Sequence, residues 1–180
     1  MSAAPGAAPC LIRDAAEADF DRIAEIYRHH VLNGFGTFDE EAPAAAAMRA
    51  RFLELRALDL PWLVAASGGN LLGYAYAAPY RPRSAYRFTL EDSIYVAPDW
   101  LRRGVATRLL DALIRRCAAA GTRQLVAVIG DSDNTASIGL HEKCGFRRAG
   151  VLRDVGFKAG RVLDTVIMQR AVTGRNGTAA

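Results

Sequence analysis

Residues 95–107 read YVAPDWLRRGVAT, which combines the end of a strand, a turn and the start of a helix. Gly104 and Ala106 lack bulky side chains, so backbone N–H groups at the helix start can approach a diphosphate, and the helix dipole favours such an anion. The spacing matches neither GxxxxGK nor GxGxxG, which argues against a nucleotide P-loop and a dinucleotide-binding turn. The segment predicts either a phosphate site of another kind or a glycine-assisted helix start with nothing bound.

On both sides of this turn, helical and strand periodicities alternate from about residue 11 to residue 170. Apolar residues at helical spacing, each run ended by Gly or Pro, predict helices near residues 20–31, between Pro43 and Pro61, and near 105–117 and 134–144. Apolar runs predict strands near residues 62–66, 71–78, 88–96, 125–129, 146–155 and 162–170. We expect a hairpin at 67–70, a turn at 157–160, and a capping box formed by Asp14 and Glu17 before the first helix.

Residues 125–129 are wholly apolar, as expected for a parallel strand that is covered on both faces. With the strand at 88–96 and the helix after it, this strand forms a βαβ unit. The other predicted connections favour antiparallel pairing. The fold class is therefore α+β, with a mixed, mostly antiparallel central sheet flanked by helices and one parallel βαβ unit.

The composition is that of an ordinary folded domain, since 51% of the 180 residues are hydrophobic and 23% are charged. We expect a single domain over residues 11–172 between small-residue tails at 1–10 and 173–180. The formal net charge is +4, but the arginines are dispersed, so the charge indicates a solvated surface and no nucleic-acid partner. No window approaches the ~18 apolar residues of a membrane span, so we expect no membrane partner.

The three cysteines are far apart and odd in number, which predicts neither a disulfide framework nor a metal pair. The three histidines are not grouped as a ligand set either, so we expect no metal. The chain opens without the basic and strongly apolar segments of an export signal. Together these features favour the cytoplasm.

The order of elements and several motifs resemble the GNAT superfamily of acetyl-CoA-dependent N-acetyltransferases. The turn with Gly104 and Ala106, the Asn134-x-x-Ser137 pair and the Gly145-Phe146 pair carry this resemblance, which covers residues 12–170. Six further segments resemble the phosphinothricin and methionine sulfoximine acetyltransferase branch: Thr37–Glu41, Tyr80–Tyr86, Glu91–Val96, Val128–Gly130, Leu140–Lys143 and Gly156–Lys158. Two positions depart from that branch, because Ala159 and Val162 stand where some members carry His and many carry Trp.

The resemblance implies that acetyl-CoA binds along the strand at 88–96, at the phosphate turn and at the start of the helix near 134. Asn134 would contact the cofactor, although a plain helix N-cap also explains this residue. The positions implied for acetyl-CoA are Ile94, Tyr95, Val96, Arg102, Arg103, Gly104, Val105, Ala106, Thr107, Asn134 and Ser137.

Two residues are candidates for catalysis. An α-ammonium group must lose a proton before it attacks a thioester, and Glu91, near the start of the central strand, is the predicted general base. Asp92 alternates to the other face and is the weaker candidate. His141 occupies the place where GNAT enzymes commonly carry a Tyr that protonates the leaving thiolate, and an imidazole can do the same.

The acceptor site is expected in the loop near residues 81–86, where the guanidiniums of Arg81 and Arg83 could clamp a carboxylate. The resemblance implies that this loop, with Tyr86, holds the amino-acid acceptor and that Phe38 covers it. Lys158 on the late turn is a possible accessory.

The expected function is therefore acetylation of the α-amino group of a small amino acid or analogue by direct transfer. An alternative within the same fold is acetylation of a protein N-terminus or a lysine side chain, for which an open acidic groove is expected. A nucleic-acid-binding module is the non-enzymatic alternative, but the sequence lacks an aromatic RNA-binding strand, a zinc site and a focused basic helix. The resemblance also implies a homodimer.

Overall fold

A computed structural model describes residues 10–172 of the chain, so the tails predicted at 1–10 and 173–180 lie outside the described residues apart from Cys10. The helices are α1 (Phe20–Asn33), α2 (Ala45–Ala57), α3 (Val105–Ala119) and α4 (Thr135–Lys143), with short 3-10 turns at Glu17–Asp19, Ser84–Tyr86 and Pro98–Trp100. The strands are β1 (Leu11–Asp14), β2 (Trp62–Ser67), β3 (Asn70–Pro79), β4 (Thr89–Val96), β5 (Gln124–Gly130), β6 (Arg147–Lys158) and β7 (Arg161–Ala171).

The seven strands form one sheet in the order β1-β2-β3-β4-β5-β7-β6. Only β4 and β5 run parallel among the described strands, and α3 connects them, which confirms the predicted α+β class and its βαβ unit. The predicted hairpin is also confirmed. Ser67 pairs with Asn70 across two glycines, Gly68 and Gly69, whose φ values of 55° and 81° suit a tight turn between twisted strands.

Two expectations about local structure are corrected. Asp14 and Glu17 do not form a capping box, because Asp14 ends the unpredicted edge strand β1, and the Asp19 carboxylate accepts the Ala16 N–H instead. Strand β1 escaped detection because its four residues are too few to show a period. The last turn is shorter than expected, since β6 runs to Lys158 and pairs it with the first residue of β7.

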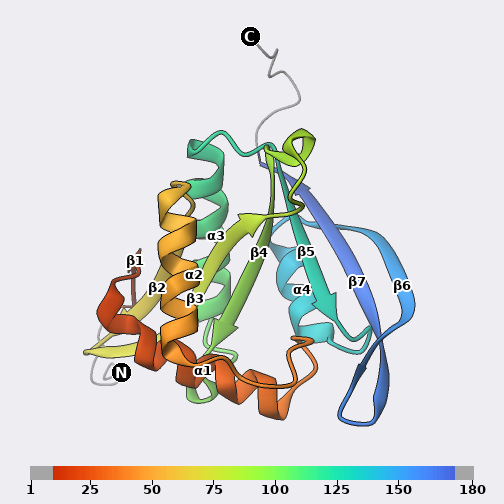
Figure 1. The fold of residues 1–180 in the computed structure, drawn as a ribbon, viewed down its shortest axis with the longest axis horizontal. Coiled ribbons are helices and arrows are strands. Elements are labelled where there is room, and N and C mark those ends of the chain that lie inside the picture. The colour runs from red at the N-terminus through yellow and green to blue at the C-terminus, as the bar shows by residue number, and fades with distance from the viewer. Residues whose placement is uncertain (1–9, 173–180) are drawn as a thin grey trace, which may run out of the picture.

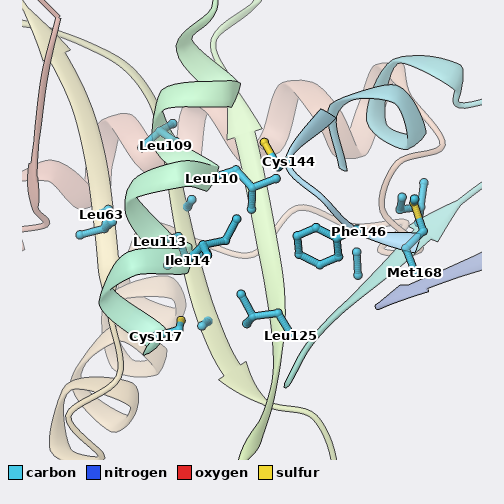
Figure 2. Packing of buried hydrophobic residues seen from close by; sticks show 14 of the residues in the cluster. Leu63, Leu109, Leu110, Leu113, Ile114, Cys117, Leu125, Cys144, Phe146 and Met168 are labelled. Atoms are coloured by element: carbon cyan, nitrogen blue, oxygen red, sulfur yellow. The ribbon is translucent and has the colours of Figure 1, made fainter. Parts of the chain in front are cut away.

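Helices cover both faces of the sheet (Figure 1). On one face, α1 and α2 pack on an aromatic cluster that includes Phe20, Phe52 and Trp62. On the other face, the apolar side of α3 packs on the strands, and Figure 2 shows Leu110 and Leu113 directed toward the sheet.

The pairing of β4 with β5 stops halfway along both strands. Residues 89–92 pair with 124–127, and although both strands are described to their ends, no further pair joins them. Strand β3 stays paired with β4 as far as Val96, and β7 stays paired with β5 as far as Gly130. The carboxyl halves of β4 and β5 therefore diverge, as Figure 1 shows, and their facing edges keep free peptide groups.

The ladder between β3 and β4 determines which peptide groups face this opening. Ala97 N–H donates to Leu72 O, and hydrogen-bonded pairs recur at every second residue of an antiparallel ladder. Tyr95 therefore bonds to β3. Ile94 and Val96 turn their peptide groups toward β5, where no strand pairs with them.

Candidate active site

A cavity of about 230 Å³ lies at the opening between β4 and β5 and extends under the loop that follows α1. Both catalytic candidates from the sequence, Glu91 and His141, line it. The lining also includes Tyr27, Thr37, Phe38, Asp39, Arg51, Tyr76, Asp92, Ile94, Tyr95 and Ser137. Titratable groups from five elements thus meet at one place, as an enzyme site requires.

Glu91 is half-buried in β4 beside this cavity. Burial raises the pKa of its carboxyl group above the usual glutamate range, and the neighbouring Asp92 raises it further. The positive charges of Arg81 and Arg51 act in the opposite direction. A carboxylate whose pKa is shifted toward neutrality is suited to accept a proton from an ammonium group.

Asp92 faces away from Glu91, as the strand alternation predicts, and it meets His141 there. Its Oδ2 atom lies 3.0 Å from His141 Nε2, and the two side chains are 1% and 3% exposed. The other carboxylate oxygen, Oδ1, is buried without a hydrogen-bond partner among the described residues. The sequence offered no signal for this pair, since 49 residues separate its members.

The hydrogen bonds of His141 favour its protonated form. Nδ1 donates to the backbone oxygen of Ser137 over 2.7 Å, because a carbonyl can only accept. Nε2 faces the Asp92 carboxylate, which also accepts when ionised. Burial lowers the pKa of His141, but the hydrogen bond and charge of Asp92 outweigh it, so the pKa is raised overall. The buried pair therefore holds a proton beside the cavity.

His30 of α1 binds the open edge of β4 at the carboxyl end of the strand. Its Nε2 donates to Val96 O over 2.8 Å, which leaves the Val96 N–H facing the gap. Burial lowers the pKa of His30, so the neutral ring with a protonated Nε2 fits this bond. No sequence pattern assigned a role to His30.

Two helix N-termini lie at the same end of the sheet as the opening, since α3 follows β4 and α4 follows β5. Gly104 caps α3 with a φ of 78°, and no atom lies within 4 Å of the place where a Cβ would stand. The first-turn N–H groups of Val105, Ala106 and Thr107 have no acceptor within the helix. These free N–H groups and the empty space beside Gly104 form an anion cradle, which a side chain at Gly104 would fill.

The side chains around this cradle are arranged as follows. Arg102 and Arg103 are exposed, and the Arg103 guanidinium lies 4.9 Å from the centre of the Trp100 ring. At the start of α4, Asn134 Oδ1 accepts the Ser137 N–H over 3.2 Å, which is the N-cap alternative expected for this residue. Val105 is buried, so only its backbone can meet a ligand.

Phe38 reaches the cavity because two strands carry glycine beneath it. A Cβ on Gly156 would lie 2.8 Å from Phe38 Cδ1 and closer still to Cε1, so the ring occupies the place of a side chain. A Cβ on Gly130 would overlap the backbone oxygen of Phe35. These glycines let the loop after α1 lie directly on the sheet.

Lys158 holds the same loop against the sheet through hydrogen bonds. Its buried Nζ donates to Gly34 O over 2.9 Å and to Thr37 O over 2.8 Å. Burial lowers the pKa of this ammonium, and the charges of Asp39 and Glu40 partly oppose that effect. The ammonium is used within the loop and does not point to a free acceptor contact.

The other predicted acceptor residues lie outside the cavity. Arg81, Arg83 and Tyr86 are exposed on the segment between β3 and β4, where the Arg81 guanidinium and the Tyr86 ring both pack against Tyr80. Arg81 is nevertheless close enough for its charge to lower the pKa of Glu91. Arg51 and Tyr76, which no sequence motif singled out, line the cavity instead.

The described residues contain no cluster of His, Cys, Asp and Glu suited to a metal ion. Within residues 10–172, no helix has the length and apolar character needed to cross a membrane.

Known proteins resemble this chain over nearly its whole length. The acetyltransferase (GNAT) family pattern matches residues 23–146. A phosphinothricin N-acetyltransferase from Alcaligenes faecalis is 53% identical over 169 residues, which are 94% of this chain and 86% of that protein. An L-methionine sulfoximine/L-methionine sulfone acetyltransferase from Pseudomonas paraeruginosa is 42% identical over 160 residues, which are 88% and 92% of the two chains.

The solved structures agree with the sequence relatives. A GNAT superfamily phosphinothricin acetyltransferase from Sinorhizobium meliloti, in complex with AcCoA, superposes with a TM-score of 0.90 at 43% identity, covering 94% of this chain and 92% of its own. The resemblance seen in the motifs is confirmed by both kinds of comparison. The chain therefore belongs to the GNAT family of acetyltransferases.

Proposed function

We propose that this protein transfers the acetyl group of acetyl-CoA to the α-amino group of a small amino acid or analogue of the phosphinothricin, methionine sulfoximine or methionine sulfone type. The names of the relatives at 53% and 42% identity support this acceptor class. The observation that carries the proposal is the half-buried Glu91 at the opening between β4 and β5, with a protonated pair, Asp92 and His141, on the other side of the same strand.

The residues present fit acetyl-CoA. The positive φ and empty Cβ position of Gly104 at the start of α3 suit a diphosphate, and the peptide groups of Ile94 and Val96 offer a strand edge to an amide-containing arm. When bound, acetyl-CoA supplies an activated acetyl thioester. The positions that the resemblance implies are proposed to hold it: Ile94–Val96, Arg102–Thr107, Asn134 and Ser137.

Three groups of this chain each serve a separate part of the reaction. Glu91 takes the proton of the α-ammonium, directly or through a water, so that the free amine can attack. The Ile94 N–H faces the opening, where an oxygen that gains negative charge needs a donor. His141, kept protonated by Asp92, lines the same cavity, and it gives a proton to the leaving thiolate once its Nε2–H leaves the Asp92 carboxylate.

Direct transfer in a ternary complex is supported by the positions of the cysteines. All three lie within the described residues, and none of them lines the cavity. Burial raises the pKa of the Cys117 thiol to about 12, so it is not a reactive thiolate. No thiol of the chain is therefore placed to carry the acetyl group.

Acceptor recognition is proposed to use both sides of the cavity. Arg81 and Arg83 capture the carboxylate, Tyr86 shapes their loop and Phe38 covers the acceptor. The charge of Arg81 already reaches Glu91, which supports its placement near the amine. Lys158 contributes by holding the Phe38 loop against the sheet.

We also propose that the protein is cytoplasmic and forms a homodimer. The three free cysteines of the chain suit a reducing compartment. Four large apolar side chains near the hairpin of β6 and β7 are more than half exposed, and a second copy would cover them: Leu152, Val155, Phe157 and Val162. Light scattering after size-exclusion chromatography tests this. A Phe157→Ser variant should be a monomer where the wild type is a dimer, and a monomeric wild type would contradict the proposal.

The function is tested by thiol release from acetyl-CoA with phosphinothricin, methionine sulfoximine, methionine sulfone, free amino acids and an unblocked peptide as acceptors. Glu91→Gln should lower kcat by roughly 10²–10⁴-fold near neutral pH and leave acetyl-CoA affinity unchanged, because Gln keeps the shape but takes no proton. The deficit should shrink as the pH approaches the pKa of the acceptor amine. Preference for the peptide would instead support acetylation of protein substrates, and a deficit independent of pH would remove Glu91 as the base.

A further inference from the structure

A bulge interrupts β6 in the middle of its hairpin with β7. The ladder between the two strands reaches Leu152 and resumes at Gly156, so residues 153–155 lie opposite Asp164 alone. In a ladder without the two extra residues, Gly156 would lie two positions, about 7 Å, further along β7 toward the turn. The bulge therefore sets the register of the outer half of the hairpin, and bulges beside active sites commonly redirect side chains in this way.

The outer half of the hairpin supports the loop that follows α1. Gly156 lies directly beneath the Phe38 ring, where a Cβ would stand 2.8 Å from Cδ1. Lys158 donates to two backbone oxygens of that loop over 2.9 and 2.8 Å, and the Arg161 guanidinium lies 4.4 Å from the centre of the Phe35 ring. All three supports lie beyond the bulge, so their positions depend on it.

The Asp164 carboxylate holds the bulge in place. Its Oδ1 atom accepts the Asp154 N–H over 3.1 Å, and its Oδ2 atom accepts from the Arg153 guanidinium over 2.6 Å. Asp154 has a φ of 58°, a left-handed conformation that lies outside the range of a regular strand. A side chain of β7 thus takes the place of a ladder hydrogen bond where the ladder is interrupted.

The same residue also connects the hairpin to the loop between β5 and α4. The Ser132 hydroxyl donates to Asp164 Oδ2 over 2.5 Å, and the Asp131 N–H donates to Asp164 O over 3.0 Å. The Asp164 side chain is 15% exposed, and it does not line the active-site cavity. An effect of Asp164 on the reaction must therefore pass through the residues that the hairpin positions.

We propose that Asp164 is a positioning residue for acceptor recognition. Its carboxylate fixes the β6 bulge, and the bulge places Gly156 and Lys158 where they hold Phe38 over the acceptor. The inference rests on the proposed function and deepens it, because it makes acceptor recognition depend on a residue outside the cavity.

The test measures steady-state kinetics with phosphinothricin as the acceptor. Asp164→Ala removes every hydrogen bond of the carboxylate, so kcat/KM for phosphinothricin should fall by about 10- to 100-fold, as expected for a shift of ~1 Å in a group that positions a substrate. The KM for acetyl-CoA should stay within about 3-fold of the wild type, because the Asp164 side chain acts through Phe38.

Two conservative variants separate the bulge from the charge. Asp164→Asn keeps a carbonyl oxygen for the Asp154 N–H and loses only the charge facing Arg153, which is 70% exposed, so kcat/KM should stay within about 3-fold of the wild type. Asp154→Asn is the matched control, since it removes the same charge from an exposed side chain on the same hairpin. It should behave like the wild type.

The decisive measurement repeats Asp164→Ala in a Phe38→Ala background. If Asp164 acts through the Phe38 ring, the second substitution should cost less than about 2-fold there, because the group it positions is already absent. A residue that only stabilises the fold would lower kcat/KM equally in both backgrounds.

Thermal unfolding shows whether Asp164→Ala is folded at the assay temperature. Asp164→Glu covers the case in which it is not, because Glu keeps the charge and the acceptor oxygens but is one methylene longer. This variant should lower kcat/KM for phosphinothricin at least about 3-fold, and only where Phe38 is present.

An unchanged kcat/KM in the folded variant, a loss in Asp164→Asn as large as in Asp164→Ala, or equal losses with and without Phe38 would overturn the positioning role and leave the acetyltransferase function intact. A wild type that acetylates neither phosphinothricin nor any other amino acid would instead overturn the proposed function, and the role of Asp164 with it.

Discussion

Replacing Gly156 by alanine would put a methyl group where the Phe38 ring lies. The new Cβ would stand 2.8 Å from Cδ1 and 3.2 Å from Cζ, and closer to Cε1 than to either. The atoms it meets are the far end of a side chain on a loop, so the ring can move while the sheet stays in place. The expected result is a displaced Phe38 in a folded protein.

The size of the effect follows from this geometry. Restoring ordinary contact requires the ring to shift by about 1 Å, and overpacking of this kind costs about 1–3 kcal/mol. A misplacement of ~1 Å in a group that positions a substrate can lower the rate up to ~10²-fold. We therefore expect kcat/KM for the amino-acid acceptor to fall by roughly 10- to 100-fold in Gly156→Ala, with the KM for acetyl-CoA unchanged.

Steady-state kinetics with varied acceptor and varied acetyl-CoA measure this split. Gly150→Ala is the matched control, because Gly150 lies on the same strand and a Cβ there meets nothing within 4 Å. It should behave like the wild type. If Gly156→Ala and Gly150→Ala have the same acceptor kcat/KM, Phe38 does not cover the acceptor, and an equal loss for both substrates would show a general disturbance of the site.

Three more variants test the rest of the site. Asp92→Asn removes the group that raises the pKa of His141, so an NMR titration should find that pKa lowered. The alkaline limb of the pH profile of kcat should move to lower pH for the same reason, and an unmoved limb would exclude the pair from catalysis. Gly104→Val should weaken acetyl-CoA binding at least about 10-fold in calorimetry, because the side chain fills the anion cradle; unchanged affinity would place the phosphates elsewhere. Arg83→Ala should raise the acceptor KM by about 10- to 100-fold, and an unchanged KM would show that the carboxylate binds elsewhere.

Local sequence patterns were enough to predict most elements of this fold. Helical spacing and glycine or proline stops predicted all four helices, and the apolar run at 125–129 predicted the parallel strand. Glu91 could be selected because one strand beside a recognisable turn limits where a base can lie. These signals are carried by residues within about a dozen positions of one another, so they can be read without the fold.

The partners of each side chain were decided by tertiary structure. Alternation placed Asp92 opposite Glu91, but only the packing of α4 on that face put His141 against it and turned a weaker base candidate into the partner of a buried histidine. Tyr74 and Trp62 have the pattern of ordinary core aromatics, and Arg51 that of a solvated helix charge, until α2 closes over the strands and leaves a cavity between them. Which donors remain unpaired depends on how separate elements meet, because burial acts on the whole packed surface and not on any one segment.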